Sequence, residues 1–191
     1  ILNYGLGNVS AFVNIYNKLG VACKLVEKKG DLIDIDKLIL PGVGAFDYAI
    51  QCFNDSGLRE EVDRLVLIEK VPILGVCVGL QMMAESSDEG VLCGLGWIDA
   101  TVVKFDSESL PVGSPLPHMG WNNLDVVKKD PLLSGLNDAK FYYLHSFYIV
   151  PKNQEEVIGS ARYGEKFCCV VRKDNIYGMQ CHPEKSHSFG V

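Results

Sequence analysis

The chain has 191 residues, of which 48% are hydrophobic and 22% charged, and its formal net charge is −6. A chain of this length and composition can bury the core of one sizeable globular domain. The acidic balance and the lack of a basic stripe argue against nucleic acid as the main partner, and no apolar run approaches the roughly 18 residues of a membrane span. We therefore expect no nucleic acid and no membrane among its partners, and a cytoplasmic location.

The N-terminal half alternates short apolar runs with helical patterns. A helix is predicted from a cap at Asn8 to about Leu19, where Gly20 stands at the position of a C′ glycine. The other predicted elements are strands over 1–3, 22–26, 37–40 and 71–76, and helices from about 46, over 56–70 and over 78–85. Strands that alternate with helices of this length indicate βαβ units and a parallel sheet.

After Gly90 the segments are strand-like and are separated by turn clusters; they cover 97–105, 121–127, 141–150, 157–162, 167–172 and 176–181. We expect them to extend the same sheet with antiparallel or mixed strands. No repeat or linker interrupts the pattern, so we interpret residues 1–191 as one α/β domain. It would have an open, mostly parallel central sheet flanked by helices, with an antiparallel extension. The chain begins with Ile1, and its termini are expected to be trimmed.

The opening N-Y-G-L-G-N-V-S resembles G-x-G-x-x-G, but Ser10 stands in place of the third glycine. Without that glycine the dinucleotide-binding fingerprint is incomplete, so a tight strand-to-helix turn is the better interpretation and no cofactor is expected. The seven cysteines form no C-x-x-C pair, and the four histidines show no zinc-like spacing with them. Reduced thiols and no metal site are therefore expected.

The segment G-V-C-V-G at 75–79 places Cys77 between two glycines after an apolar run. Free cysteine is among the most buried residue types, so a small core residue is the first alternative. The pattern also has the form of a nucleophile elbow, in which glycines two residues on either side relieve crowding around a nucleophile on a strained strand-to-helix turn. A helix beginning at Val78 would point its first N–H groups at the sulfur and favour the thiolate.

The segment C-H-P-E at 181–184 supplies a base and an orienting group. His182 precedes a proline, which biases its backbone toward an extended conformation, and in extended backbone residues i and i+2 lie on the same side. The carboxylate of Glu184 can therefore reach the imidazole of His182 and fix its tautomer. His182 alone could equally be a capping histidine, but beside an elbow cysteine the pair predicts nucleophilic catalysis at strand ends.

The segment Pro41-Gly42-Val43-Gly44 follows a predicted strand. Backbone N–H groups around Gly42, Val43 and Gly44, together with the N–H of Val78, would be donors to the oxyanion of an acyl-transfer intermediate. Alone, the segment fits a plain β-turn equally well, so its significance depends on Cys77 and His182.

Together, P-G-x-G, G-x-C-x-G-x-Q and H-P-E, in this order over 41–184, resemble the class I (triad) glutamine amidotransferases. P-H-M-G-W-N at 117–122, Y-L-H-S-F at 143–147 and H-P-E-K-S at 182–186 narrow the resemblance to the glutaminase subunits of imidazole glycerol phosphate synthase, and it covers essentially the whole chain. This resemblance implies a flavodoxin-like three-layer fold and hydrolysis of L-glutamine to glutamate and ammonia through a Cys77 thioester. It also implies a heterodimer in which the ammonia passes to a (β/α)8-barrel cyclase subunit.

The same resemblance implies roles for individual residues. The catalytic triad would be Cys77, His182 and Glu184. The glutamine substrate would be held by Gln81, His145 and Ser146. The partner would be faced by Asn8, Met119, Trp121 and Lys185.

The chain departs from the family's usual pattern at Asn3, Val78 and Cys181. These departures leave open a paralogue that supplies ammonia to a different synthase, such as one that amidates a sugar for surface polysaccharide. A catalytically silent binding module and a cysteine hydrolase acting on peptides are further alternatives, which the complete triad and Gln81 disfavour. Glycines at 42 and 44 make rotation of the oxyanion segment cheap, and low glutaminase activity is predicted for the isolated chain.

Overall fold

The computed structural model describes residues 1–111, 113–136 and 138–191. Within these residues the centre of the fold is a six-stranded sheet in the order β1-β2-β11-β10-β9-β6. The first three strands run parallel, and the other three continue the sheet with antiparallel pairs. The strands are β1 Leu38–Gly42, β2 Ile73–Cys77, β6 Asp125–Val126, β9 Val157–Tyr163, β10 Glu165–Lys173 and β11 Ile176–Met179. This mixed α/β sheet confirms the predicted fold class.

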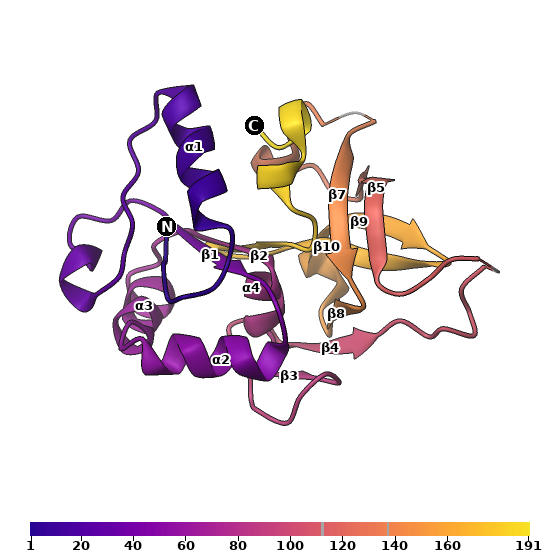
Figure 1. Ribbon diagram of the computed structural model, residues 1–191, viewed down its shortest axis with the longest axis horizontal. Coiled ribbons are helices and arrows are strands. Elements are labelled where there is room, and N and C mark those ends of the chain that lie inside the picture. The colour runs from indigo at the N-terminus through magenta and orange to yellow at the C-terminus, as the bar shows by residue number, and fades with distance from the viewer. Residues whose placement is uncertain (112, 137) are drawn as a thin grey trace.

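Helices cover both faces of the parallel part of the sheet. Figure 1 shows α1 on one side of β1 and β2, and α2 and α3 on the other. The helices are α1 Val9–Leu19, α2 Phe46–Asp55, α3 Arg59–Asp63, which continues as a π-helix over Arg64–Ile68, and α4 Val78–Met82. Short 3₁₀ turns cover Lys29–Leu32, Pro131–Leu133, Gln154–Glu156, Pro183–Lys185 and His187–Phe189.

Two smaller sheets lie beside the antiparallel part. One pairs β4 with β3 and β8, and the other pairs β5 with β7. These strands are β3 Ser86–Ser87, β4 Ala100–Lys104, β5 His118–Asn123, β7 Lys140–His145 and β8 Phe147–Pro151. The register of β5 and β7 places His118 opposite His145.

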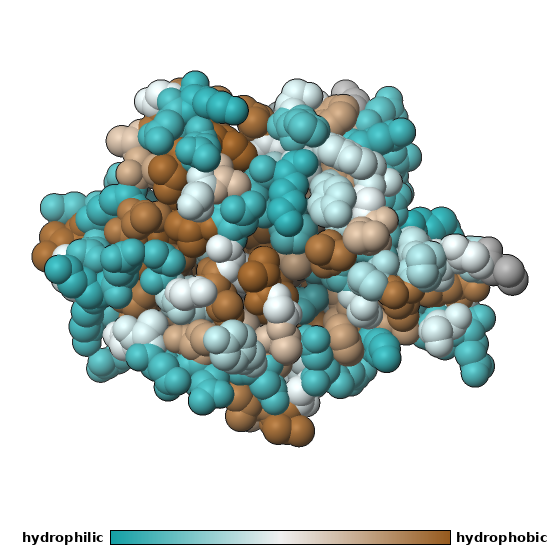
Figure 2. All heavy atoms as spheres, in the orientation of Figure 1, coloured by the Kyte–Doolittle hydropathy of each residue, from teal (hydrophilic) through white to brown (hydrophobic). Residues whose placement is uncertain are grey.

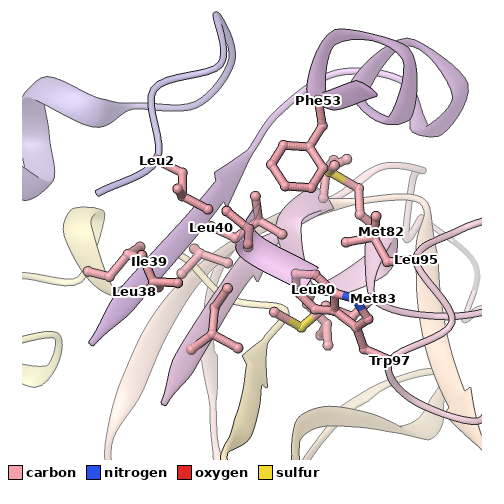
Figure 3. Packing of buried hydrophobic residues seen from close by; sticks show 14 of the residues in the cluster. Leu2, Leu38, Ile39, Leu40, Phe53, Leu80, Met82, Met83, Leu95 and Trp97 are labelled. Carbon is pink, nitrogen blue, oxygen red and sulfur yellow. The ribbon is translucent and has the colours of Figure 1, made fainter. Parts of the chain in front are cut away.

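The core packs against the parallel strands, whose sequences are almost entirely apolar because helices bury both faces. Leu40 of β1, Leu80 of α4 and Phe53 of α2 belong to one buried cluster (Figure 3). Each such side chain contributes about 1.5–3 kcal/mol on burial. A second cluster lies under the antiparallel strands, and Leu74 of β2 packs against both clusters. Strands β10 and β11 also place side chains in both clusters, so the central sheet joins the two halves of the molecule.

Several predicted elements differ from the structure. The predicted strands over 1–3 and 22–26 are reduced to a single bridge between Leu2 and Val26. The strands predicted over 97–105 and 141–150 belong to the two smaller sheets instead of extending the central one. The predicted helix over 56–70 begins only at Arg59, because Gly57 at φ +72° forms the turn after α2. The predicted helix over 78–85 ends at Met82, whose carbonyl accepts a hydrogen bond from the N–H of Leu95 instead of continuing the helical ladder.

Hydrophilic and hydrophobic residues are mixed over the face shown in Figure 2. Across the ranges described above, the helices are too short and too polar for any of them to cross a membrane.

Candidate active site

Cys77 occupies a strained turn between β2 and α4. It is the last residue of β2 and has φ 55° and ψ −113°, a conformation that L-residues rarely adopt. The strand approaches in extended backbone and the helix begins at the next residue, so the cysteine itself takes the whole change in chain direction. This is the strand-to-helix elbow that the sequence predicts.

The elbow glycines permit close backbone packing rather than relieving crowding at Cys77 itself. A Cβ at Gly79 would lie 1.9 Å from the carbonyl oxygen of Leu40 on β1, and a Cβ at Gly75 would lie 2.8 Å from the carbonyl oxygen of Gly79. A Cβ at Gly42 would lie 2.3 Å from the amide nitrogen of Gly79. The first turn of α4 therefore rests directly on the end of β1, which brings the oxyanion segment beside the nucleophile.

His182 and Glu184 form the predicted pair just beyond β11. The Nδ1 of His182 and the Oε1 of Glu184 are 2.8 Å apart, and both side chains are almost fully buried. Burial alone would lower the pKa of His182, but the interactions of its ring with Cys77 and Glu184 outweigh this effect and raise the pKa to about 9. The ring is therefore held as an imidazolium beside the sulfur, as an acid–base partner for a cysteine nucleophile requires.

Ser186 fastens the His182 segment to β7. Its Oγ donates to the carbonyl of His182 at 2.6 Å and accepts from the N–H of Tyr142 at 3.0 Å. The N–H of His182 donates to the carbonyl of Tyr142 at 2.8 Å. The H-P-E-K-S motif thus contains its own clamp, which fixes the imidazole of His182 relative to the neighbouring strand.

The oxyanion segment is held from behind by the turn that opens the chain. The hydroxyl of Tyr4 donates to the carbonyl of Pro41 at 2.6 Å. Gly7 has φ +98°, and a Cβ there would lie 2.6 Å from the Cβ of Pro41. Beyond this support Gly44 has φ +91° and nothing close to its Cβ position, so the end of the segment retains room to rotate.

A cavity of about 250 Å³ opens over Cys77. Of the predicted oxyanion residues, Val43, Gly44 and Val78 line it, whereas Gly42 lies behind them in β1. The predicted glutamine-binding residues also line it, together with other residues of the quoted motifs and with Glu89, which no motif indicated. The walls include Gln81, His145, Ser146, His182, Lys185, Glu89, Pro117, Leu144 and Phe147.

His145 contributes to the cavity through its ring and not through a free nitrogen. Its Nε2 lies 3.1 Å from the Nδ1 of His118, and its Nδ1 lies 2.8 Å from the carbonyl oxygen of Phe147. Both nitrogens are therefore engaged within the protein.

Two functional candidates escaped the sequence reasoning. Glu89 lies on the cavity wall from the loop after β3, and its Oε2 accepts from the N–H of Phe46 at 2.9 Å. Gln180 is fully buried, and its Nε2 lies 3.8 Å from the Sγ of Cys77. Glu89 has no periodic signal to reveal it, but Gln180 stands two residues before His182, and the strand period of two could have placed it on the same side.

The predicted partner-facing residues are all exposed. Met119 and Trp121 alternate with inward residues along β5 and are 67% and 47% exposed. Asn8 precedes α1, where its backbone carbonyl, and not its side chain, accepts the first helical hydrogen bonds. Lys185 borders the cavity and lies over the ring of Tyr142.

Comparison with known proteins places this geometry in a family. The glutamine amidotransferase class-I family matches residues 1–190. The imidazole glycerol phosphate synthase subunit HisH of Bdellovibrio bacteriovorus is 48% identical over 192 residues, covering 100% of this chain and 94% of that protein. Subunit HisH 2 of Pseudomonas aeruginosa is 42% identical with the same coverage.

Solved structures agree on the fold. A structure described as a glutamine amidotransferase superposes with a TM-score of 0.72 at 20% identity, covering 99% of this chain and 92% of that one. The structure of PurLQS from Thermotoga maritima gives a TM-score of 0.71 at 18% identity, covering 96% of this chain and 85% of that one. The family match and the relatives that cover the whole chain show that the chain belongs to the class-I glutamine amidotransferase family.

Proposed function

We propose that this chain is the glutaminase subunit of imidazole glycerol phosphate synthase in histidine biosynthesis, acting as a single cytoplasmic domain in a heterodimer. The observation that carries the proposal is the buried Cys77–His182–Glu184 arrangement in a chain that matches subunits of that name over its full length. The reaction is hydrolysis of L-glutamine to glutamate and ammonia.

Cys77 is the nucleophile. Its thiolate attacks the side-chain carboxamide carbon of glutamine, while the backbone N–H of Val78 and those of the segment at Val43 and Gly44 receive the developing oxyanion. His182, held as the imidazolium by Glu184, gives a proton to the departing ammonia and then accepts one from the water that hydrolyses the thioester. The product is glutamate, and Cys77 returns to its starting state.

The substrate's amino-acid end fits the cavity wall opposite the triad. Both Nε2 protons of Gln81 are used, toward the carbonyl of Phe147 at 3.0 Å and the Oε1 of Gln180 at 3.1 Å. Its Oε1 is then an acceptor for the substrate's ammonium group, and the carboxylate of Glu89 on the same cavity adds the opposite charge. Ser146 can donate to the substrate's carboxylate, and His145 holds the segment between them.

The ammonia passes to a (β/α)8-barrel cyclase subunit, which forms imidazole glycerol phosphate and aminoimidazole carboxamide ribotide. The partner is seated on the exposed side chains of β5, with Asn8 and Lys185 at its margin. Exposed Met and Trp side chains are typical of interface centres. Trp121 is also stacked on His187, with 5.4 Å between ring centroids, so it is held in place before a partner arrives.

A paralogue with another synthase partner is the second candidate. The Pseudomonas aeruginosa relative is named subunit HisH 2, so the experiment below includes an outcome for such a paralogue. Two of the three departures, at Asn3 and Cys181, lie away from the cavity. Asn3 donates a hydrogen bond to Glu27 on the surface, and Cys181 is buried behind the site. The third, Val78, lines the cavity, where its backbone N–H is a donor whatever the side chain.

The test is glutamate production from glutamine by this chain alone, and then with the barrel cyclase and its phosphosugar substrate. We expect strong stimulation on mixing, and its loss in Cys77→Ala. Trp121→Ala should weaken the complex, whereas Ile68→Ala, which removes an exposed apolar side chain at the end of the α3 segment, should not. If mixing gives no stimulation while a glutamine analogue still alkylates Cys77, the chain serves a different synthase.

A further inference from the structure

A hydrogen-bonded chain of side chains runs from strand β5 to the sulfur of Cys77. It begins at Asn122, whose Oδ1 accepts from the N–H of Asn123 at 2.8 Å, while its Nδ2 donates to the carbonyl of Arg162 at 2.8 Å. These two backbone anchors fix the orientation of the amide. The same Nδ2 lies 3.2 Å from the Nε2 of His118. Because this amide nitrogen can only donate, the Nε2 of His118 is the acceptor and its Nδ1 carries the hydrogen.

The tautomer of His145 is fixed from both sides, by His118 and by the carbonyl of Phe147. The Nδ1–H of His118 donates to the Nε2 of His145 at 3.1 Å, so the Nδ1 of His145 carries the hydrogen and donates to the carbonyl of Phe147 at 2.8 Å. Burial lowers the pKa of His118 to about 4 and that of His145 to about 3, so both rings are neutral. Each ring then has a single donor and a single acceptor, and both are used.

The carbonyl of Phe147 links the two histidines to two glutamines. It also accepts from the Nε2 of Gln81 at 3.0 Å, and the second hydrogen of that amide goes to the Oε1 of Gln180 at 3.1 Å. The oxygen of Gln180 is thereby assigned, and its Nε2 is the atom that faces the Sγ of Cys77 at 3.8 Å. Gln180 is 0% exposed, so no bulk water can replace this contact.

We propose that this chain of five side chains positions the nucleophile, with Gln180 donating to the sulfur of Cys77 and His118 acting on it from a distance. The proposal rests on Cys77 being the nucleophile of the proposed function. If the chain were broken at His118, the Nε2 of His145 would lose its donor, and the ring would hold the carbonyl of Phe147 less firmly. Gln81 and Gln180 depend on that carbonyl for their position, so the donor at the sulfur of Cys77 would be displaced.

The reactivity of Cys77 toward iodoacetamide tests this without substrate or partner. Mass spectrometry of the separate peptides follows Cys77, while the exposed Cys23 and Cys93 serve as internal references for a folded chain. His118→Phe keeps an aromatic ring stacked between Tyr143 and Tyr163 but removes both nitrogens. Gln180→Leu removes the donor at the sulfur. Each should slow alkylation of Cys77 by about tenfold, the value of one lost buried hydrogen bond.

A double variant separates positioning from loss of packing. If His118 acts through Gln180, His118→Phe should add almost nothing in a Gln180→Leu background, because the affected contact is already gone. Independent, multiplying effects would overturn the proposal, and so would an unchanged or faster rate in either single variant.

Two further variants complete the test. His118→Asn keeps an amide donor close to the position of the ring Nδ1 and should recover a large part of the rate. Tyr163→Phe removes only the hydroxyl that donates to the carbonyl of Pro115, which lies outside the chain, and should alkylate like the wild type. Failure of the asparagine variant to recover any rate would count against the assigned tautomers. A wild-type Cys77 that does not react at all would instead contradict the proposed function.

Discussion

Glu184→Gln is the sharpest test of how the imidazole is held. The substitution keeps the shape of the side chain and an acceptor for the Nδ1–H of His182, but it removes the negative charge. In the structure the Oε1 of Glu184 lies 2.8 Å from that nitrogen, and its Oε2 is buried without a hydrogen-bond partner among the residues described. The second oxygen makes no compensating contact, so the change isolates the electrostatic support that Glu184 gives to the imidazolium.

The magnitude follows from the pKa of His182. Its rise from the ordinary 6.5 to about 9 corresponds to about 3 kcal/mol in favour of the charged ring, shared between Cys77 and Glu184. Because the folded-state pKa lies above the unfolded value, this stabilisation is fully present below about pH 6.5 and is lost as the pH rises through about 9. Glu184→Gln should therefore flatten the dependence of the free energy of unfolding on pH within this window.

The assay is urea unfolding at pH 6 and at pH 9.5, in Cys77→Ala and in Cys77→Ala with Glu184→Gln. Removing the sulfur leaves only the carboxylate's share, and the groups that titrate elsewhere are common to both variants. Between pH 6 and pH 9.5, we expect the free energy of unfolding of Cys77→Ala to fall by about 1–2 kcal/mol more than that of the double variant. With Cys77 present, Glu184→Gln should lower glutamate production by at least about tenfold. Equal pH dependences in the two variants would refute this account of the pKa.

Two other outcomes follow from contacts of the site. Gly79→Ala should destabilise the fold by about 3 kcal/mol or more, because its Cβ would lie 1.9 Å from the carbonyl oxygen of Leu40. Gly30→Ala is the control and should be tolerated, because nothing lies near its Cβ. Thermal unfolding of both variants decides this. Because His118 and His145 are neutral in the fold but protonate near pH 6.5 when unfolded, the free energy of unfolding should fall as the pH drops from 6.5 toward 4. His118→Phe should flatten that decline, and a decline of unchanged steepness would show that the ring does not carry it.

The sequence was sufficient to predict the geometry of the candidate site because the parts of that site are local. The elbow is contained in five consecutive residues around Cys77, and His182 and Glu184 lie within three residues. The pair forms as predicted, but the 3₁₀ turn Pro183–Lys185 brings the two side chains together, and not the extended backbone that the sequence indicates. The order of strands and helices before Gly90 likewise predicted the parallel pair of β1 and β2. The predicted strand over 22–26 was wrong in extent because it lies at the sheet margin, where only Val26 makes a bridge.

What the sequence could not predict depends on register between distant strands. The pairing of His118 with His145 exists only because β5 and β7 align in that register. The elbow glycine Gly79 is required by Leu40, a residue of another strand, and not by the cysteine beside it. Glu89 reaches the cavity from an irregular loop, where no period predicts the direction of a side chain. Side-chain pattern therefore identified the chemistry, while tertiary contacts determined which neighbours support it.

The conformation of Cys77 implies that the fold gives up stability to present its nucleophile. Its φ of 55° and ψ of −113° fall in a region that glycine occupies readily and other residues only under strain of about 1–3 kcal/mol. Cys77→Ala and Cys77→Gly both remove the thiol, but only the glycine variant removes the strain. Glycine also loses more backbone freedom on folding, about 0.5–1 kcal/mol. We expect Cys77→Gly to be the more stable variant by about 1 kcal/mol, a rise of about 2–4 °C in Tm for a chain of this size. Calorimetry of the two variants at one pH gives the comparison. An alanine variant as stable as the glycine variant, or more stable, would mean that the elbow is not strained and that its geometry costs the fold nothing.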